Sequence, residues 1–203
     1  MRSVRPITPF LPAVGLVMLL ALPAAAVNPD MTKQLLIDDF SDADAVSAVG
    51  TRWEGLTDRV MGGRSDMEMT IREGDDGGLL HMSGTVRLEN RGGFIQARLP
   101  LDVRGGHFDA SDWWGVRLEV RGRPGPYYVH LRTRQNWMPW QYFRARFEVG
   151  PEWRELSIPF SEFEGVSTRR NLDVRALKSI AVVAYGEAFE AEIEVARIEL
   201  VAP

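Results

Sequence analysis

Two short segments concentrate the residues that could do chemistry, and each contains two adjacent glycines. The first runs from Trp53 to Ser65 (WEGLTDRVMGGRS), and the second runs from Leu88 to Arg98 (LENRGGFIQAR). Asp58 and Glu89 precede the two glycine pairs, and a pair of carboxylates can hydrolyse a glycosidic bond. Adjacent glycines allow positive φ angles and close backbone approach, so both segments are predicted to form shaped loops.

Other catalytic chemistry has little support. Ser65 and His81 could act as nucleophile and base, but the Gly-x-Ser-x-Gly pattern is absent. The phosphate-binding pattern Gly-x-x-x-x-Gly-Lys-[Ser/Thr] is also absent, so the first glycine pair is not predicted to bind a nucleotide. Asp58 could simply pair with Arg59 or stabilise a turn. We therefore predict no catalytic residues and no enzyme activity, with two-carboxylate hydrolysis as the less favoured alternative.

The sequence also lacks the usual ligand patterns for a metal or a cofactor. The chain has no cysteine, and its three histidines (His81, His107 and His130) are scattered and form no His-x-x-x-His pair. These features argue against a zinc site. The acidic residues between positions 38 and 42 lack the spacing of an EF-hand calcium loop. We predict no metal and no cofactor.

The N-terminus has the pattern of a secretory signal peptide. Arg2 and Arg5 precede an apolar stretch of 13 residues from Phe10 to Leu22, and three alanines ending at Ala26 fit a cleavage site. A membrane-spanning helix needs about 20 apolar residues, so an uncleaved anchor is the weaker alternative. The predicted organisation is a signal peptide over 1–26, a leader over 27–34 and one domain over 35–203, in a periplasmic or secreted protein.

The charge of the chain argues against some partners. The formal net charge is −4, and loss of Arg2 and Arg5 with the signal peptide would change it to −6. A net acidic protein is a poor candidate for binding nucleic acid through charge alone. We predict no nucleic-acid partner and no membrane span after cleavage.

Apolar and polar residues alternate in several runs, which is the pattern of strands with one buried face. The alternation is clearest in Trp114–Arg121, Tyr127–Arg134 and Tyr142–Val149. The runs Glu68–Glu73 and Leu79–Leu88 flank a glycine-rich turn and predict a hairpin. Further strands are predicted at Leu35–Phe40, Trp53–Leu56, Gly93–Leu99, Trp153–Ile158, Ser179–Tyr185 and Ala191–Val201.

About ten short strands separated by turn signals, with almost no helix, favour an all-β antiparallel sandwich or jelly roll. A loop is predicted from Pro159 to about Asp173, and a helical turn from Val174 to Leu177. Trp53, Trp114 and Trp153 lie in strand patterns and are predicted to belong to the core.

Three of these strands carry arginines and tyrosines on their polar sides. The residues are Arg117, Glu119 and Arg121, then Tyr128, His130, Arg132 and Arg134, and then Tyr142, Arg144 and Arg146. If the three strands are neighbours, one sheet has an outer face rich in arginine and tyrosine. The charge pattern favours a solvated face with salt bridges, and the alternative is a concave platform for a polar partner.

Two tryptophans flank Met138-Pro139 in a predicted loop. If Trp137 and Trp140 are exposed, they mark an interaction surface. The alternative is that both fold back over the core, because tryptophan is usually largely buried. The sequence leaves these two interpretations open.

The two glycine loops resemble the signatures of a known family. Asp58 to Ser65 resembles the D-x-V-M-G-G-x-S signature of the complex I intermediate-associated protein family, and Gly84 to Phe94 resembles its G-x-V-x-L-E-N-x-G-G-F block. Ile158 to Phe163 is similar to its L-P-F-x-x-F element, with isoleucine in the first place. The resemblance extends over about Leu36 to Val201, and two long blocks in the right order make it specific.

The resemblance implies a galactose-binding-like β-sandwich (jelly roll) close to carbohydrate-binding modules. Eukaryotic members are mitochondrial chaperones that help to assemble respiratory complex I. A mitochondrial presequence would be arginine-rich and amphipathic, whereas this leader has a continuous apolar core. We therefore expect a non-enzymatic binding module or assembly chaperone that is exported to the envelope, with a carbohydrate-binding module as the alternative.

The expected partner is a protein or a glycan. In this interpretation the signature residues order the two loops, and arginines and tryptophans near 132–140 contact the partner. The alternative is that the loops pack on each other and serve folding only. The candidate binding residues are Asp58, Arg59, Met61, Gly62, Gly63, Ser65, Glu89, Asn90, Gly92, Gly93, Phe94, Arg132, Arg134, Trp137 and Trp140.

Overall fold

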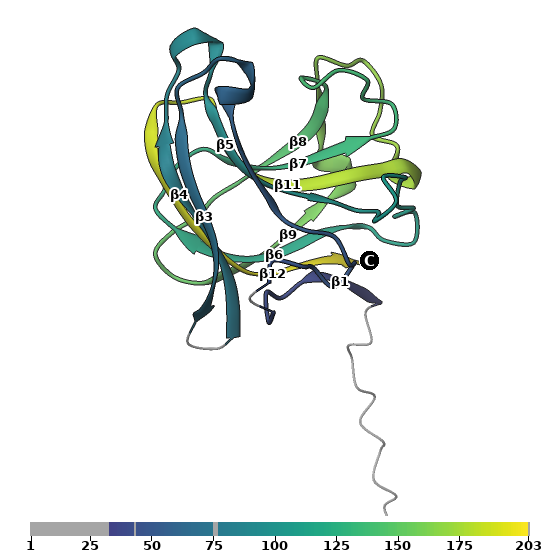
Figure 1. Ribbon diagram of the computed structural model, residues 1–203. Coiled ribbons are helices and arrows are strands. Elements are labelled where there is room, and N and C mark those ends of the chain that lie inside the picture. The colour runs from purple at the N-terminus through teal and green to yellow at the C-terminus, as the bar shows by residue number, and fades with distance from the viewer. Residues whose placement is uncertain (1–32, 43, 75–76, 203) are drawn as a thin grey trace, which may run out of the picture. The chain divides into compact units, whose positions relative to one another are not determined.

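The alternating sequence folds into two antiparallel sheets, which Figure 1 shows as two layers. This is a computed structural model, and it describes residues 33–42, 44–74 and 77–202. The predicted signal peptide and most of the leader lie outside the described residues. In the described ranges, no helix has the length and apolar character to cross a membrane.

The first sheet has the order β3-β4-β12-β6-β9, with β1 also paired to β12. Its strands are β1 (Gln34–Asp38), β3 (Asp66–Gly74), β4 (Gly77–Val86), β6 (Gly115–Gly122), β9 (Arg154–Pro159) and β12 (Phe189–Val201). Gly74 pairs with Gly77 at the end of the β3–β4 hairpin, as the glycine-rich turn predicts.

The second sheet has the order β10-β8-β7-β11-β5-β2. Its strands are β2 (Glu54–Thr57), β5 (Phe94–Pro100), β7 (Tyr127–Thr133), β8 (Tyr142–Phe147), β10 (Glu164–Val166) and β11 (Leu177–Tyr185). Four 3-10 turns complete the described elements: η1 (Asp58–Met61), η2 (Glu89–Arg91), η3 (Phe160–Glu162) and η4 (Val174–Ala176).

The core is formed by the inward positions of both sheets. In β7, Tyr127, Val129 and Leu131 are fully buried, whereas Tyr128 and Arg132 point outward and are half-buried. Burial of such side chains is the main favourable contribution to folding, at about 25 cal/mol per Å² of apolar surface. The alternation that predicts the strands is therefore the pattern that fills the interior.

Three details of the prediction are wrong. Trp153 precedes β9, is only half-buried and does not belong to the core cluster. Trp114 is 41% exposed, because it precedes β6 rather than belonging to its alternation. The predicted loop after Pro159 contains β10, which pairs with β8. A strand of three residues is too short for its alternation to be recognised in a sequence.

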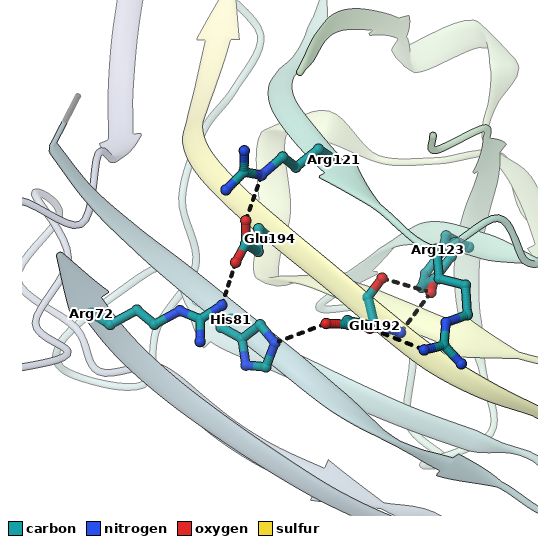
Figure 2. Close-up of polar contacts among 7 residues, drawn as sticks. Arg72, His81, Arg121, Arg123, Glu192 and Glu194 are labelled. Carbon is teal, nitrogen blue, oxygen red and sulfur yellow. Dashed lines mark hydrogen bonds and ion pairs between the residues drawn. The ribbon is translucent and has the colours of Figure 1, made fainter. Parts of the chain in front are cut away.

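The three strands rich in arginine do not share one sheet, so the condition for a single outer face made by all three is not met. β6 belongs to the first sheet, whereas β7 and β8 belong to the second. The outer face of the first sheet carries ion pairs instead: Glu194 binds Arg72 and Arg121 on either side, and Glu192 lies between His81 and Arg123 (Figure 2). This face fits the favoured interpretation, a solvated surface with salt bridges.

Candidate functional site

The first glycine loop is organised around the carboxylate of Asp58, which is fully buried. Its Oδ1 accepts a hydrogen bond from the Ser65 amide at 2.9 Å, and its Oδ2 accepts one from Ser65 Oγ at 2.5 Å. Oδ2 also accepts a bond from the amide of Gly93 in the second loop at 2.6 Å. A single carboxylate therefore joins the two signature segments.

The glycines are needed because the backbone passes very close to that carboxylate. A Cβ atom built on Gly63 would lie 2.3 Å from Asp58 Cγ, and one on Gly92 would lie 2.3 Å from Asp58 Oδ2. Gly62 and Gly93 have φ angles of +88° and +125°, which L-residues rarely adopt. Each glycine pair therefore supplies one close approach and one left-handed backbone position.

The remaining polar signature residues connect the loops. Arg59 Nε donates to the Ser65 carbonyl at 2.9 Å, and Asn90 Nδ2 donates to the Gly62 carbonyl at 3.2 Å. Glu89 is exposed, and its carbonyl oxygen accepts the Gly92 amide at 3.0 Å. These contacts agree with the alternative in which the two loops pack on each other.

Burial alone would raise the pKa of Asp58, but the hydrogen bonds from Ser65 Oγ, the Gly93 amide and the Ser65 amide outweigh it and hold the pKa below its ordinary value. The carboxylate is ionised, buried and fully used as an acceptor. It cannot contact a glycosidic oxygen, so the two-carboxylate mechanism with Asp58 and Glu89 lacks one of its groups. Ser65 is likewise fully buried, and it donates to Asp58 rather than to His81.

A hollow of about 460 Å³ lies on the outer face of the second sheet. Its floor crosses β5, β11 and β7, and its rim comes from η1 and the β7–β8 loop. The lining residues are Leu56, Val60, Met61, Gly92, Phe94, Gln96, Arg98, His130, Arg132, Pro139, Trp140, Tyr142, Val166, Ser167, Ser179, Ala181 and Tyr185.

Small residues on β11 create the hollow. Ala181 pairs with Arg98 of β5 on one side and with His130 of β7 on the other, while Ser179 pairs with Arg132. Neighbouring strands lie about 4.8 Å apart, and β11 lies between β5 and β7. Arg98 and Arg132 are therefore separated by the width of β11. Large side chains therefore surround a floor made of Ser179 and Ala181.

Aromatic rings form one wall of the hollow. The His130 ring stacks on Tyr142 with centroids 4.1 Å apart, and Tyr185 meets His130 edge-on at 6.0 Å. Burial, together with the positive charge of Arg144, lowers the pKa of His130 to about 3. His130 is therefore neutral at physiological pH.

The rim is held in place by hydrogen bonds. Arg132 Nη2 donates to the carbonyls of Asn136 (3.3 Å) and Met138 (3.1 Å) in the β7–β8 loop. Gln141 accepts the Met138 amide with Oε1 at 3.2 Å and donates to the Ser167 carbonyl with Nε2 at 3.3 Å. The loop that carries the two tryptophans is therefore tied both to the floor and to the segment after β10.

The tryptophans themselves are exposed, Trp137 by 82% and Trp140 by 53%, so the alternative in which they cover the core is wrong. Trp140 lines the hollow, whereas Trp137 does not. Arg134 follows β7 and is exposed outside the lining. Of the candidate binding residues, those that the hollow brings together are Met61, Gly92, Phe94, Arg132 and Trp140.

Four lining residues that the later argument uses, Gln96, Arg98, Ser179 and Ala181, were not among the candidate binding residues. Gln96 and Arg98 alternate with the buried Ile95, Ala97 and Leu99, and this period of two was the available signal for an outward-facing pair. Ser179 and Ala181 gave no such signal, because β11 is buried along most of its length. A continuous apolar run does not show which face is covered.

The fold is that of a β-sandwich carbohydrate-binding module. It is similar to the family 11 module of the cellulosomal cellulase Lic26A-Cel5E of Clostridium thermocellum, with a TM-score of 0.66 and 16% identity over 86% of this chain and 97% of that one. The same module in complex with a β-1,3-1,4-mixed-linked tetrasaccharide matches with a TM-score of 0.65 and 16% identity, over 83% of this chain and 95% of that one. Identity this low establishes the fold alone.

The sequence identifies the family. The profile of the complex I intermediate-associated protein 30 (CIA30) family matches residues 39–191, and the chain belongs to this family. The mouse (Mus musculus) protein named complex I intermediate-associated protein 30, mitochondrial, is 29% identical over 141 residues, which are 61% of this chain and 42% of that protein. The chain thus spans about two fifths of the length of this relative, and the predicted family and fold are confirmed.

Proposed function

We propose that this domain is a non-enzymatic binding module of the assembly-factor type, and that the hollow on the second sheet binds a segment of a partner protein. The observation that carries the proposal is the composition of the hollow. Arg98 and Arg132 flank its floor, and exposed Met61 and Trp140 form its rim. Arginine, methionine and tryptophan are enriched at protein interfaces. The mouse relative is named complex I intermediate-associated protein 30, and this name is the support for proposing an assembly role for this chain.

The absence of catalysis is part of the proposal. Asp58, at the centre of the first signature loop, is buried, and both of its oxygens accept hydrogen bonds. It stabilises the fold and is not placed to transfer a proton to a substrate. In the described part of the chain, no group of three or more histidine, aspartate or glutamate side chains could hold a metal ion. The burial and hydrogen bonding of Asp58 support a binding role rather than a catalytic one.

Export is a further part of the proposal, and it rests on the pattern of residues 1–26. The partner would then be met in the bacterial envelope or outside the cell. Mass spectrometry of the N-terminus of the protein from its own cells tests this directly. A mature chain that begins at Val27 is expected, and a chain that keeps its first 26 residues in the cytoplasm would contradict export.

Site-specific photo-crosslinking tests the binding role. A photo-crosslinking amino acid at position 140, at the rim, is expected to capture a recurrent protein partner. The same group at position 155 of β9, on the other sheet, is the matched control. Ala181→Trp fills the hollow and is expected to abolish the adduct, with Ser179→Trp as a second blocking variant. Adducts that persist in correctly folded blocking variants would contradict the proposal.

A glycan is the second candidate ligand, and the tetrasaccharide-bound structure with the same fold favours it. Sugars bind proteins through aromatic rings and hydrogen bonds, and the hollow contains Tyr142, Tyr185 and Gln96. Titration with the β-1,3-1,4 tetrasaccharide, followed by tryptophan fluorescence, tests this candidate. A saturable change that Trp140→Phe and Ala181→Trp both remove would select the glycan over the protein partner.

A further inference from the structure

The hollow is lined by basic and not by acidic side chains, although Arg98 also pairs with Glu54, which lies outside the lining. Its seventeen lining residues, all within the described part of the chain, include two arginines and no aspartate or glutamate. The chain as a whole has a formal net charge of −4, so this concentration of positive charge runs against the average of the molecule. A positively charged recess attracts the anionic groups of a ligand.

Both guanidinium groups keep donors free for a ligand. Arg98 Nη2 binds Glu54 at 2.5 Å, and Arg132 Nη2 binds two loop carbonyls, as described above. Across the described residues, Nη1 of either arginine forms no hydrogen bond, and neither Nε atom has a partner although both are buried. Burial and the positive charge of Arg98 lower the pKa of Arg132, so the two groups lie close enough to repel each other.

The chemistry of a carboxylate suits both guanidinium groups. A carboxylate accepts forked hydrogen bonds from guanidinium groups, and it would relieve the repulsion between the two cations. The small floor residues Ser179 and Ala181 leave the space that such a group needs. Ser179 Oγ and the Gln96 amide add neutral donors beside it.

The rim selects a polypeptide rather than a sugar as the carrier of the carboxylate. Val60, Met61 and Val166 border the hollow, and the first two are at least half exposed. Aliphatic and thioether side chains suit the apolar side chains of a peptide, whereas sugars stack on flat aromatic faces. One face of the Tyr142 ring is already covered by His130.

We propose that the hollow binds an acidic polypeptide segment, with one carboxylate side chain between Arg98 and Arg132 and a neighbouring apolar side chain against Met61 and Trp140. This inference rests on the proposed binding function and specifies its ligand. The partner is identified by its chemistry, as an exposed acidic segment that also carries apolar residues.

Peptide selection tests the proposal without knowledge of the natural partner. A random 12-residue peptide library is selected on the full chain and, in parallel, on the Arg98→Gln/Arg132→Gln double variant. Peptides selected on the wild-type protein are expected to contain at least about twice the input frequency of Asp and Glu. The double variant is expected to remove this enrichment and to weaken the best peptide at least about tenfold, because charge-assisted hydrogen bonds are lost.

Two further variants provide the controls. Arg146→Gln removes an arginine of β8 that lies outside the hollow, and it should change the affinity less than about twofold. Ala181→Glu keeps both arginines and places an acid on the floor, so it tests the charge preference even if the double variant does not fold. It is expected to suppress selection of acidic peptides.

The results separate this inference from the proposed function. Selected peptides without acid enrichment, or with equal enrichment on the double variant, would overturn the acidic-segment inference. An oligogalacturonate that binds the hollow more tightly than any selected peptide would also overturn it and indicate an acidic glycan. Crosslinked partners that still depend on an open hollow would leave the proposed function intact, whereas crosslinks insensitive to Ala181→Trp would reject it.

Discussion

Asp58 illustrates how much one side chain contributes to this domain. It accepts hydrogen bonds from the amide and the hydroxyl group of Ser65 in its own loop and from the amide of Gly93 in the second loop, and it is fully buried. Hydrogen bonds to a buried charge contribute more to stability than neutral ones, because a buried charge that loses them is not solvated by water instead. The residue that most resembles a catalytic acid in the sequence is therefore a structural centre.

We expect Asp58→Asn to destabilise the fold by about 3 kcal/mol, because an amide turns a donor toward at least one backbone N–H and removes the charge. Urea denaturation followed by tryptophan fluorescence measures the change. Glu89→Gln is the matched control, since Glu89 is exposed, and it should stay within about 0.5 kcal/mol of the wild type. Equal stability of the two variants would contradict the central role of Asp58.

The same side chain gives a pH dependence with a defined sign. The folded state holds the pKa of Asp58 below its ordinary value of 3.8, so folding favours the ionised form. The stabilisation is therefore complete above the unfolded pKa and is lost as the pH falls through the folded pKa. The stability difference between wild type and Asp58→Asn should stay constant near neutral pH and shrink below about pH 3.8. A difference that grows in acid would contradict this assignment.

Part of this site could be predicted from the residues alone. The signature identified the family and the two loops, and the exposure of Trp137 and Trp140 was one of two open alternatives. The burial of Asp58 could not be predicted, because it depends on contact between segments 35 residues apart in the sequence. Arg98 ends the second glycine-rich segment, but it lies outside the family signature, which ends at Phe94.

At the scale of the elements, the two loops fit together because glycines let the chain pass beside a carboxylate. Gly63→Ala and Gly92→Ala would each place a Cβ atom 2.3 Å from an atom of Asp58. We expect each substitution to destabilise the fold by about 1–3 kcal/mol, because a packed interior accommodates an added methyl group poorly. Thermal denaturation provides the measurement.

Gly150→Ala is a suitable control for these variants. A Cβ atom at that position would meet nothing within 4 Å, and its φ angle is not in the left-handed range. The substitution should be neutral or slightly stabilising, by up to about 1 kcal/mol, because alanine restricts the unfolded chain. If Gly63→Ala behaved like Gly150→Ala, the close approach to Asp58 would have no energetic consequence.

The strands show which information the sequence carries at this scale. Alternation placed the inward residues of β6, β7 and β8 correctly, because burial of one face requires a period of two. It could not show that β6 and β7 belong to different sheets, since neighbours in a sheet are chosen by contacts distant in sequence. The separation of the two arginine-rich faces depended on that choice.

At the scale of the whole molecule, the two sheets present outer faces with different chemistry. On the first sheet, the charges are paired in rows such as Arg72–Glu194–Arg121 (Figure 2). On the second sheet, Arg132 has no acid within ion-pair distance in the described ranges, and the face is hollowed. The second sheet also has ion pairs, Arg98–Glu54 and Arg146–Glu148, but among the described residues it combines them with an arginine that has no acidic partner and with a hollow.

These faces should respond independently to mutation. Glu194→Gln leaves Arg72 and Arg121 without their shared partner and is expected to lower stability by about 1 kcal/mol, with no change in capture through position 140. Ala181→Trp is expected to abolish capture. Denaturation and crosslinking of both variants provide the comparison, and loss of capture in Glu194→Gln would show that the faces are coupled.

The neutral His130 has a consequence for titration experiments. Its pKa of about 3 leaves it uncharged across the usual range of buffers, and arginine stays protonated in proteins. The charge contributed by His130 and the two arginines is therefore constant from about pH 5 to 9. The carboxylates of an acidic peptide ionise below that range, so the affinity for such a peptide should stay constant there, and a midpoint would report a different ionisable group on the bound molecule.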